Sequence, residues 1–194
     1  MEDMGYTSIE SMFNNYKCYY DFLLTHNEIS FANDYKSQFS KVMLLACASY
    51  FETLVVTKIH CMLNPSQCNL THDFIDNKAL TRQYHTLFDW KKRNANQFFS
   101  FFGPKFKEFM IEKVKSSTEL TKSISDFMEI GELRNKLAHN NYATFVLEST
   151  AEEIYNKFLN AHSFVSQLDT FSTQLESKLV NSNSLSPAKK ITCK

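Results

Sequence analysis

The sequence is poor in the residues that turn a chain or break a helix. Its 194 residues include only three Gly and three Pro. A many-stranded β fold needs frequent tight turns, which these residues supply, so their scarcity favours long helices. A phosphate-cradling loop is also hard to build from three scattered glycines, and the sequence contains no Walker motif, dinucleotide fingerprint or nucleophile elbow.

An excess of charge of either sign is also missing. The 21 Lys and Arg residues balance the 21 Asp and Glu residues, so the formal net charge is zero. Proteins that bind nucleic acid over their whole surface are usually basic. Any contact with RNA must therefore be a local patch rather than a global field.

Signals for export or membrane insertion are lacking as well. The acidic N-terminus, Met1–Asp3, carries no apolar signal segment. The five cysteines are odd in number, which suits a reducing compartment. The longest nearly apolar run, Val42–Val56, is interrupted by Glu52 and is too short and too polar to span a bilayer. We therefore predict a cytoplasmic protein that does not contact a membrane.

What the sequence does contain is apolar residues at helical spacing along most of its length. The expected helices run from about Ser8 to Leu24, Asn33 to Met62, Ala79 to Trp90, Pro104 to Lys115, Ser117 to His139, and from a capping box at Ser149–Glu152 to Leu179. The 18 Phe and 9 Tyr residues predict a bulky core. The predicted fold class is all-α, an up-and-down bundle of about four to six helices over residues 1–180, with a disordered tail at 181–194.

One cation lies where helical packing would prefer a leucine. On a helical wheel of about 100° per residue, Arg134 falls on the apolar face with Phe127, Ile130 and Ala138. An arginine cannot be neutralised, so its burial requires a carboxylate, a phosphate or water. Glu52, inside the most apolar predicted helix, is the internal candidate. Such a pair would either fix the register of the two helices or orient Arg134 toward a ligand phosphate.

A histidine follows this arginine by five residues. On a straight helix that separation sets the side chains of Arg134 and His139 roughly 140° apart. They converge only if the helix ends or bends near Ala138, or if a second subunit brings its own copies alongside. Asn140-Asn141-Tyr142 is consistent with a helix end there. The alternative interpretation is that His139 only complements the dipole at a helix C-terminus.

The segment Arg134–His139, RNKLAH, resembles the signature of the HEPN superfamily. That signature is an Arg, usually followed by a polar residue, with a His after a short gap, and here four residues intervene. The context is similar too, because an amphipathic helix precedes the motif and a long helix follows it. Residues 48–52 look like the second-helix region of prokaryotic members. The resemblance is closest to the RiboL-PSP and MAE types found in defence and toxin loci.

The resemblance implies a metal-independent endoribonuclease without a cofactor. His139 would act as general acid or base on the ribose 2′-OH and the leaving 5′-oxygen, because imidazole titrates near neutral pH. Arg134 would neutralise charge on the phosphoryl oxygens, and Asn135 would bind the phosphate or hold His139. The products would be a 2′,3′-cyclic phosphate and a 5′-OH. Glu52, with Asn140 and Tyr142 after the motif, would support the site.

The resemblance also implies partners. Family members usually form homodimers in which two signatures line one cleft, and a toxin or antiviral effector would be restrained by an antitoxin or defence-system partner. Several members keep the fold without activity, so a non-catalytic binding or scaffold module is the alternative function.

Two further clusters allow a functional and a structural interpretation. Lys91-Lys92-Arg93, together with Lys136, would bind the RNA backbone, or would be a solvated charge cluster. His60, Cys61, Cys68 and His72 are ligand types for zinc, but they lack the spacing of a zinc finger, so we predict ordinary interior or loop residues and no metal site.

Overall fold

The computed structural model describes residues 3–63 and 69–184, and within these ranges it contains helices and no strands. The elements are α1 (Met4–Thr25), α2 (Ile29–Leu63), α3 (Asn69–Ile75), the π-helical turn η1 (Asp76–Leu80), the 3₁₀ turn η2 (Tyr84–Thr86), α4 (Asn96–Phe101), α5 (Pro104–Ser116), α6 (Thr118–His139), α7 (Ala151–Val165) and α8 (Leu168–Ser184). The all-α prediction is confirmed, with more helices than the four to six expected.

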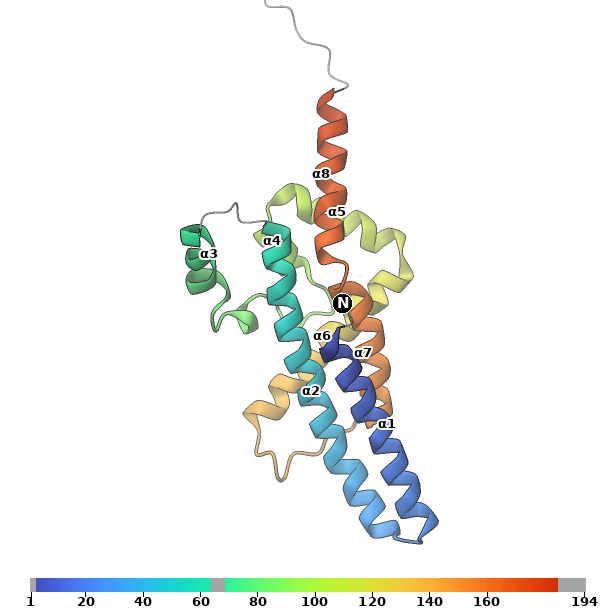
Figure 1. The fold of residues 1–194 in the computed structure, drawn as a ribbon. Coiled ribbons are helices and arrows are strands. Elements are labelled where there is room, and N and C mark those ends of the chain that lie inside the picture. Colours follow the sequence, from blue (N-terminus) through green and yellow to red (C-terminus); the bar gives the residue numbers. More distant parts are fainter. Residues whose placement is uncertain (1–2, 64–68, 185–194) are drawn as a thin grey trace, which may run out of the picture.

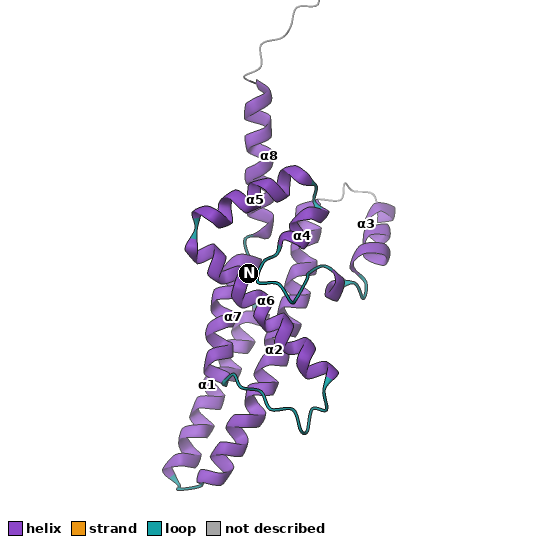
Figure 2. Cartoon of the chain, turned by 180° about the vertical axis from the view of Figure 1, so that it is seen from behind, coloured by secondary structure: helices purple, strands orange, loops and turns teal. Residues whose placement is uncertain are grey.

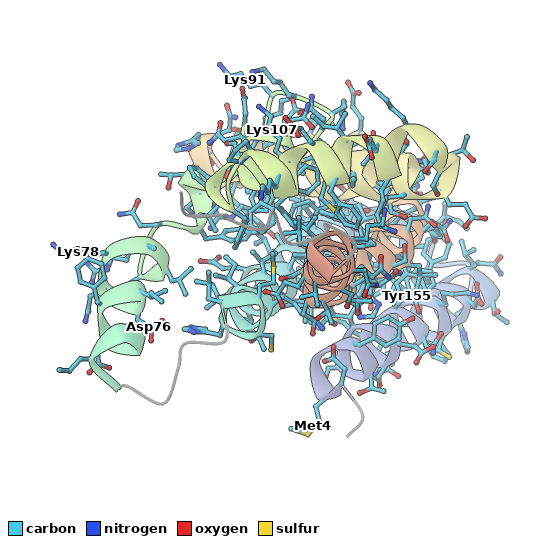
Figure 3. The ribbon with its side chains drawn as sticks, turned by 90° about the horizontal axis from the view of Figure 1, so that it is seen from above. Met4, Asp76, Lys78, Lys91, Lys107 and Tyr155 are labelled. Carbon is cyan, nitrogen blue, oxygen red and sulfur yellow. The ribbon has the colours of Figure 1, made fainter. Side chains whose placement is uncertain are left out.

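Four helices form the body of the molecule. α1 and α2 are an antiparallel hairpin, α6 and α7 a second pair, and α2 packs against α1, α6, α7 and α8 (Figure 1). α8 continues beyond the bundle, and the α3–η1 segment stands to one side of it (Figure 2). Seen from above, Asp76 and Lys78 lie on this outlying segment, whereas Lys91 and Lys107 lie on the side formed by α5 (Figure 3).

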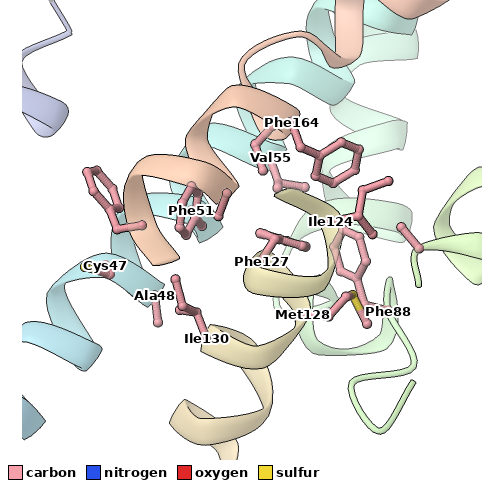
Figure 4. Packing of buried hydrophobic residues seen from close by; sticks show 14 of the residues in the cluster. Cys47, Ala48, Phe51, Val55, Phe88, Ile124, Phe127, Met128, Ile130 and Phe164 are labelled. Carbon is pink, nitrogen blue, oxygen red and sulfur yellow. The ribbon is translucent and has the colours of Figure 1, made fainter. Parts of the chain in front are cut away.

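The core is aromatic, as the composition predicts. Phe51 of α2 meets Phe127 of α6 edge to face, with ring centroids 5.5 Å apart, and Phe127 meets Phe164 of α7 at 5.8 Å (Figure 4). All three side chains are almost completely buried. Tilted and edge-to-face ring pairs are favourable because a ring edge is positive and a ring face negative. These contacts hold α6 against α2 and so fix the position of the helix that carries Arg134.

The long helix α2 was expected at the centre of the bundle, and its buried residues lie there. The run Val42–Val56 is by itself too short and too polar to span a bilayer. The whole helix, with 35 residues, is nevertheless long and apolar enough to cross a membrane by length and composition alone. A single helix of this kind is weak evidence of a membrane span, since the core helix of a bundle meets the same criteria.

Three predicted boundaries need correction. The segment from Ala79 to Trp90 is not a helix but the end of η1, the short turn η2 and irregular chain. The capping box lies one residue later than predicted, because Thr150 and Glu153 bond each other's backbone N–H groups. The last predicted helix is two helices, α7 and α8, separated at Ser166-Gln167.

The predicted disordered tail began at residue 181. Helix α8 continues to Ser184, past that boundary, and residues 185–194 lie outside the described part of the chain.

Candidate functional site

Helix α6 carries the Arg-His motif at its C-terminal end. Ser117 caps its first turn by accepting a hydrogen bond from the N–H of Leu120 at 3.1 Å, and the helix ends at His139. Ile130 and Leu137 are buried beside the motif. Ala138, which the helical wheel placed on the apolar face, is exposed instead.

Arg134 is half-buried and lines a small pocket among aromatic side chains. The lining residues are Ala48, Phe51, Tyr84, His85, Trp90, Phe127, Ile130, Gly131, Arg134 and Asn135. Nη1 of Arg134 donates to Oδ1 of Asn135 at 3.3 Å. Among residues 3–63 and 69–184, no carboxylate lies within ion-pair distance of this guanidinium. The pocket therefore contains a permanent cation whose charge is not matched by a direct internal partner.

Glu52 is half-buried on α2, one residue after Phe51 of the pocket lining. It forms no ion pair with Arg134 in the described part of the chain, so the predicted direct pair is not made. The charges of Glu52 and Arg134 nevertheless act in opposite directions on the pKa values of Tyr84 and His85. Glu52 therefore shares the electrostatic environment of Arg134 without accepting a hydrogen bond from it.

Tyr84 and His85 are the site residues that sequence analysis missed. Burial raises the pKa of Tyr84, Glu52 raises it further and Arg134 opposes the shift, so this phenol stays neutral. Desolvation, then Arg134 and more weakly His139, lower the pKa of His85, while Glu52 raises it. His85 gave no sequence signal, because no motif includes it and its partners are remote in the chain.

Trp90 lines the arginine pocket and packs against α6. Its indole N–H donates to the backbone carbonyl of His85 at 2.9 Å. Its ring lies directly on Gly131 of α6, where any Cβ atom would overlap the indole. Gly131 thus permits an approach that no other residue at this position would allow without displacement of the ring.

A second, open groove adjoins the arginine pocket. It is lined by Phe88, Asp89, Trp90, Lys91, Glu132, Asn135, Lys136, His139 and Asn140. Trp90 and Asn135 belong to both linings. A ligand in the groove would therefore contact the imidazole of His139 and pass the amide that holds Arg134.

His139 is exposed at the last position of α6. Its charge contributes to the pKa shift of His85, as does that of Arg134. Both members of the motif thus act electrostatically on one histidine of the same chain. The side chains of Arg134 and His139 were expected to converge only if the helix ended or bent near Ala138, or through a second subunit. Helix α6 does end there, at His139.

The chain after His139 is held by two contacts. The Asn140 amide donates to the carbonyl of Lys136 at 2.6 Å and covers the open end of α6. Nζ of Lys41, a buried lysine of α2, donates to the carbonyl of Tyr142 at 2.9 Å and lies 5.0 Å from the centre of its ring. Both residues that were expected to support the motif therefore have contacts that position it.

The predicted basic cluster is largely neutralised locally. Lys92 pairs with Asp89 at 2.9 Å, and Arg93 reaches Glu129 at 3.1 Å and Glu132 at 3.5 Å on α6.

Lys136 also pairs with Glu132, at 2.7 Å. Of the four predicted RNA-binding cations, Lys91 and Lys136 line the groove. Lys92 instead pairs within the segment before α4, and Arg93 joins that segment to α6.

The zinc interpretation has little support in the described residues. Nε2 of His60 lies 2.9 Å from Oδ1 of Asp76. Within the described residues, no three His, Cys, Asp or Glu side chains converge on a point that could hold a metal ion. Cys68 and the side chain of His72 lie outside the described residues.

An all-α bundle in which α6 carries an arginine in one pocket and ends in a histidine at the adjoining groove fits a helical domain of the HEPN type. The chain belongs to the RiboL-PSP-HEPN family, whose sequence profile matches residues 13–176. The match extends from α1 into α8 and includes the whole Arg134–His139 motif. No match to a curated protein or to a solved structure was found.

Proposed function

We propose that this chain is a metal-independent endoribonuclease with its active centre at Arg134, Asn135 and His139. The observation that carries the proposal is the unpaired guanidinium of Arg134 in its half-buried pocket. A cation kept in such a place without a carboxylate is matched by a ligand that brings negative charge. The phosphodiester of RNA is such a ligand.

The reaction is attack of the ribose 2′-oxygen on the adjacent phosphorus, with departure of the 5′-oxygen. It yields a 2′,3′-cyclic phosphate and a 5′-OH. Arg134 donates to the phosphoryl oxygens as negative charge grows on them, and a planar guanidinium can do so with two parallel hydrogen bonds. His139 moves a proton at one of the two ester oxygens, because imidazole exchanges protons near neutral pH.

The remaining residues position these groups. Asn135 holds the guanidinium through its Oδ1 and leaves its amide for the phosphate. Glu52 balances the charge of the pocket without occupying Arg134. Asn140 and Tyr142 fix the chain that follows His139. RNA enters through the groove, where Lys91 and Lys136 meet its backbone locally, whereas Lys92 and Arg93 are engaged by carboxylates.

Such an activity suits a toxin or an antiviral-defence effector that works in the cytoplasm. Its restraint would come from an antitoxin or another defence-system protein. Homodimerisation, usual in the family, would place two motifs at one cleft.

The second candidate is a non-catalytic HEPN module that binds RNA or protein. The local ion pairs of Lys92, Arg93 and Lys136 favour it, because they leave little free positive charge for a long RNA.

The test is RNA cleavage in the presence of a chelator by the wild type, Arg134→Ala and His139→Ala. We expect cleavage by the wild type and a loss of roughly 10²–10⁴-fold in each folded variant. Lys157→Ala, which removes another cation in contact with α6, is the matched control and should cleave normally. Intact RNA with every protein would rule out the nuclease and leave the binding module.

A further inference from the structure

The arginine pocket is lined by an imidazole that does not belong to the motif. His85 lines it together with Arg134 and Asn135, and His139 lies close enough for its charge to reach His85. We propose that His85 is a catalytic base of this site, taking the proton from the ribose 2′-OH while His139 of the same chain protonates the leaving 5′-oxygen. The inference rests on the proposed ribonuclease function and assigns the two proton transfers to separate groups.

The backbone of His85 is held in place although it lies in irregular chain. The indole of Trp90 donates to its carbonyl at 2.9 Å. The side-chain amide of Gln97 donates to the next carbonyl, of Thr86, at 2.8 Å. Because both bonds use the backbone of residues 85 and 86, the imidazole of His85 remains available to a ligand. A catalytic group needs this combination of a fixed main chain and an unoccupied side chain.

The surroundings keep His85 in the form that a base requires. The charged and titratable groups around it are Arg134 and His139 of α6, Glu52 of α2 and the neighbouring Tyr84. Desolvation and the cations lower its pKa below the usual 6.5, against the smaller opposing effect of Glu52. His85 is therefore neutral at neutral pH and has a free nitrogen lone pair.

The proposed step balances in protons and bonds. The 2′-OH loses its proton to His85, the 2′-oxygen bonds to phosphorus, the bond from phosphorus to the 5′-oxygen breaks, and His139 gives its proton to that oxygen. Arg134 stabilises the charge on the two non-bridging oxygens. The enzyme is left with protonated His85 and neutral His139, and exchange with water restores both.

A substrate with sulfur in place of the scissile 5′-oxygen separates the two roles. A thiolate leaves without a proton because thiols are far more acidic than alcohols. On ordinary RNA, His85→Ala and His139→Ala should each lose roughly 10²–10⁴-fold in rate. On the sulfur substrate His139→Ala should recover to near the wild-type rate, whereas His85→Ala should stay slow.

The pH profile gives a second readout that a merely structural residue would not move. In the wild type, kcat/KM should fall toward acid as His85 becomes protonated, with its midpoint below 6.5. His85→Gln should lose this acidic limb. His26→Ala, which changes an exposed histidine at the far end of α1, should retain both the limb and the rate.

Each outcome decides between the proposals. A wild type that cleaves neither substrate overturns the ribonuclease function and this inference with it. A wild type that cleaves while folded His85→Ala stays within about threefold on both substrates overturns the base alone. Recovery of His85→Ala on the sulfur substrate would also overturn it, because His85 would then be the acid.

Discussion

Polar side chains in the first half of α6 and Arg134 in the second half differ in whether another helix supplies a partner. In the first half, Ser123 and Asp126 are buried, and each has partners on α7: Ser123 bonds Ser163 at 2.8 Å, and Asp126 accepts from Asn160 at 2.8 Å. In the second half, Arg134 has only its neighbour Asn135 as a hydrogen-bond partner in the described chain.

Buried polar groups with complete internal partners stabilise a particular packing, whereas those without partners cost stability and persist where function requires them. Asp126 therefore joins α6 to α7, whereas Arg134 lacks such a partner and, under the proposed function, receives the phosphate of the ligand. Substitutions at Arg134, Asp126 and Gly131 of α6 test this difference, and one at the cap of α7 is the reference for a purely structural change.

The largest expected effect is on activity, from Arg134→Leu. Loss of the guanidinium should lower RNA cleavage by about 10²–10³-fold. The free energy of unfolding should stay the same or rise, because leucine suits an aromatic pocket better than an unpaired cation. Cleavage assays and urea unfolding of the same samples measure both. A loss of several kcal/mol in stability would mean that Arg134 is part of the framework, as Asp126 is.

Asp126→Ala should give the opposite result. It removes the acceptor of Asn160 and the partner of Lys122, whose ammonium lies 2.5 Å away. The expected loss is about 1.5–3 kcal/mol in the free energy of unfolding, since a hydrogen bond to a buried charged group is lost. Cleavage by the fraction that remains folded should be unchanged. Glu153→Ala also removes a carboxylate, but one that caps α7 and has no contact with Asp126, so it does not test this pairing.

Gly131→Ala tests the boundary between the two halves. The added methyl group overlaps the Trp90 ring and should destabilise the protein by about 1–3 kcal/mol, as overpacking does. Because Trp90 also lines the groove and binds the backbone of His85, cleavage should fall as well. Crosslinking or fluorescence of Trp90, the single tryptophan of the chain, would report its displacement; an unchanged emission spectrum would contradict this account.

The smallest effect is expected from Thr150→Ala. Thr150 caps α7 by accepting from the N–H of Glu153 at 3.2 Å. Removal of such a cap costs about 1 kcal/mol. Thermal unfolding should detect this change while the cleavage rate stays constant. A matched Thr173→Ala substitution, at an exposed position within α8, should have a smaller effect.

Features that depend on residues close together in the sequence could be predicted, and features that depend on distant residues could not. Helix α6 is recognisable because its apolar period and its Ser117 cap are local features. Arg134 stands out for the same reason, as a cation within that period. The segment 79–90 was predicted wrongly because its conformation depends on contacts distant in sequence, such as the packing of Trp90 on Gly131.

The same limit applied to the site. Arg134, Asn135 and His139 lie within one motif and could be proposed together. His85 and Tyr84 reach the pocket from a different part of the chain, and a histidine without a neighbouring motif has no distinguishing sequence feature. The direct Glu52–Arg134 pair was a reasonable inference from two misplaced charges, but two half-buried residues on adjacent helices need not be within bonding distance.

Lys41 connects the long hairpin to the end of the motif. This buried ammonium donates to the Tyr142 carbonyl and lies beside the Tyr142 ring. Separating the two would leave a charge in the interior without these contacts, at a high energetic cost. The loop after His139 must therefore follow α2 whenever that helix shifts. A protein that binds the turn between α1 and α2 would therefore act on the position of His139 without entering the groove.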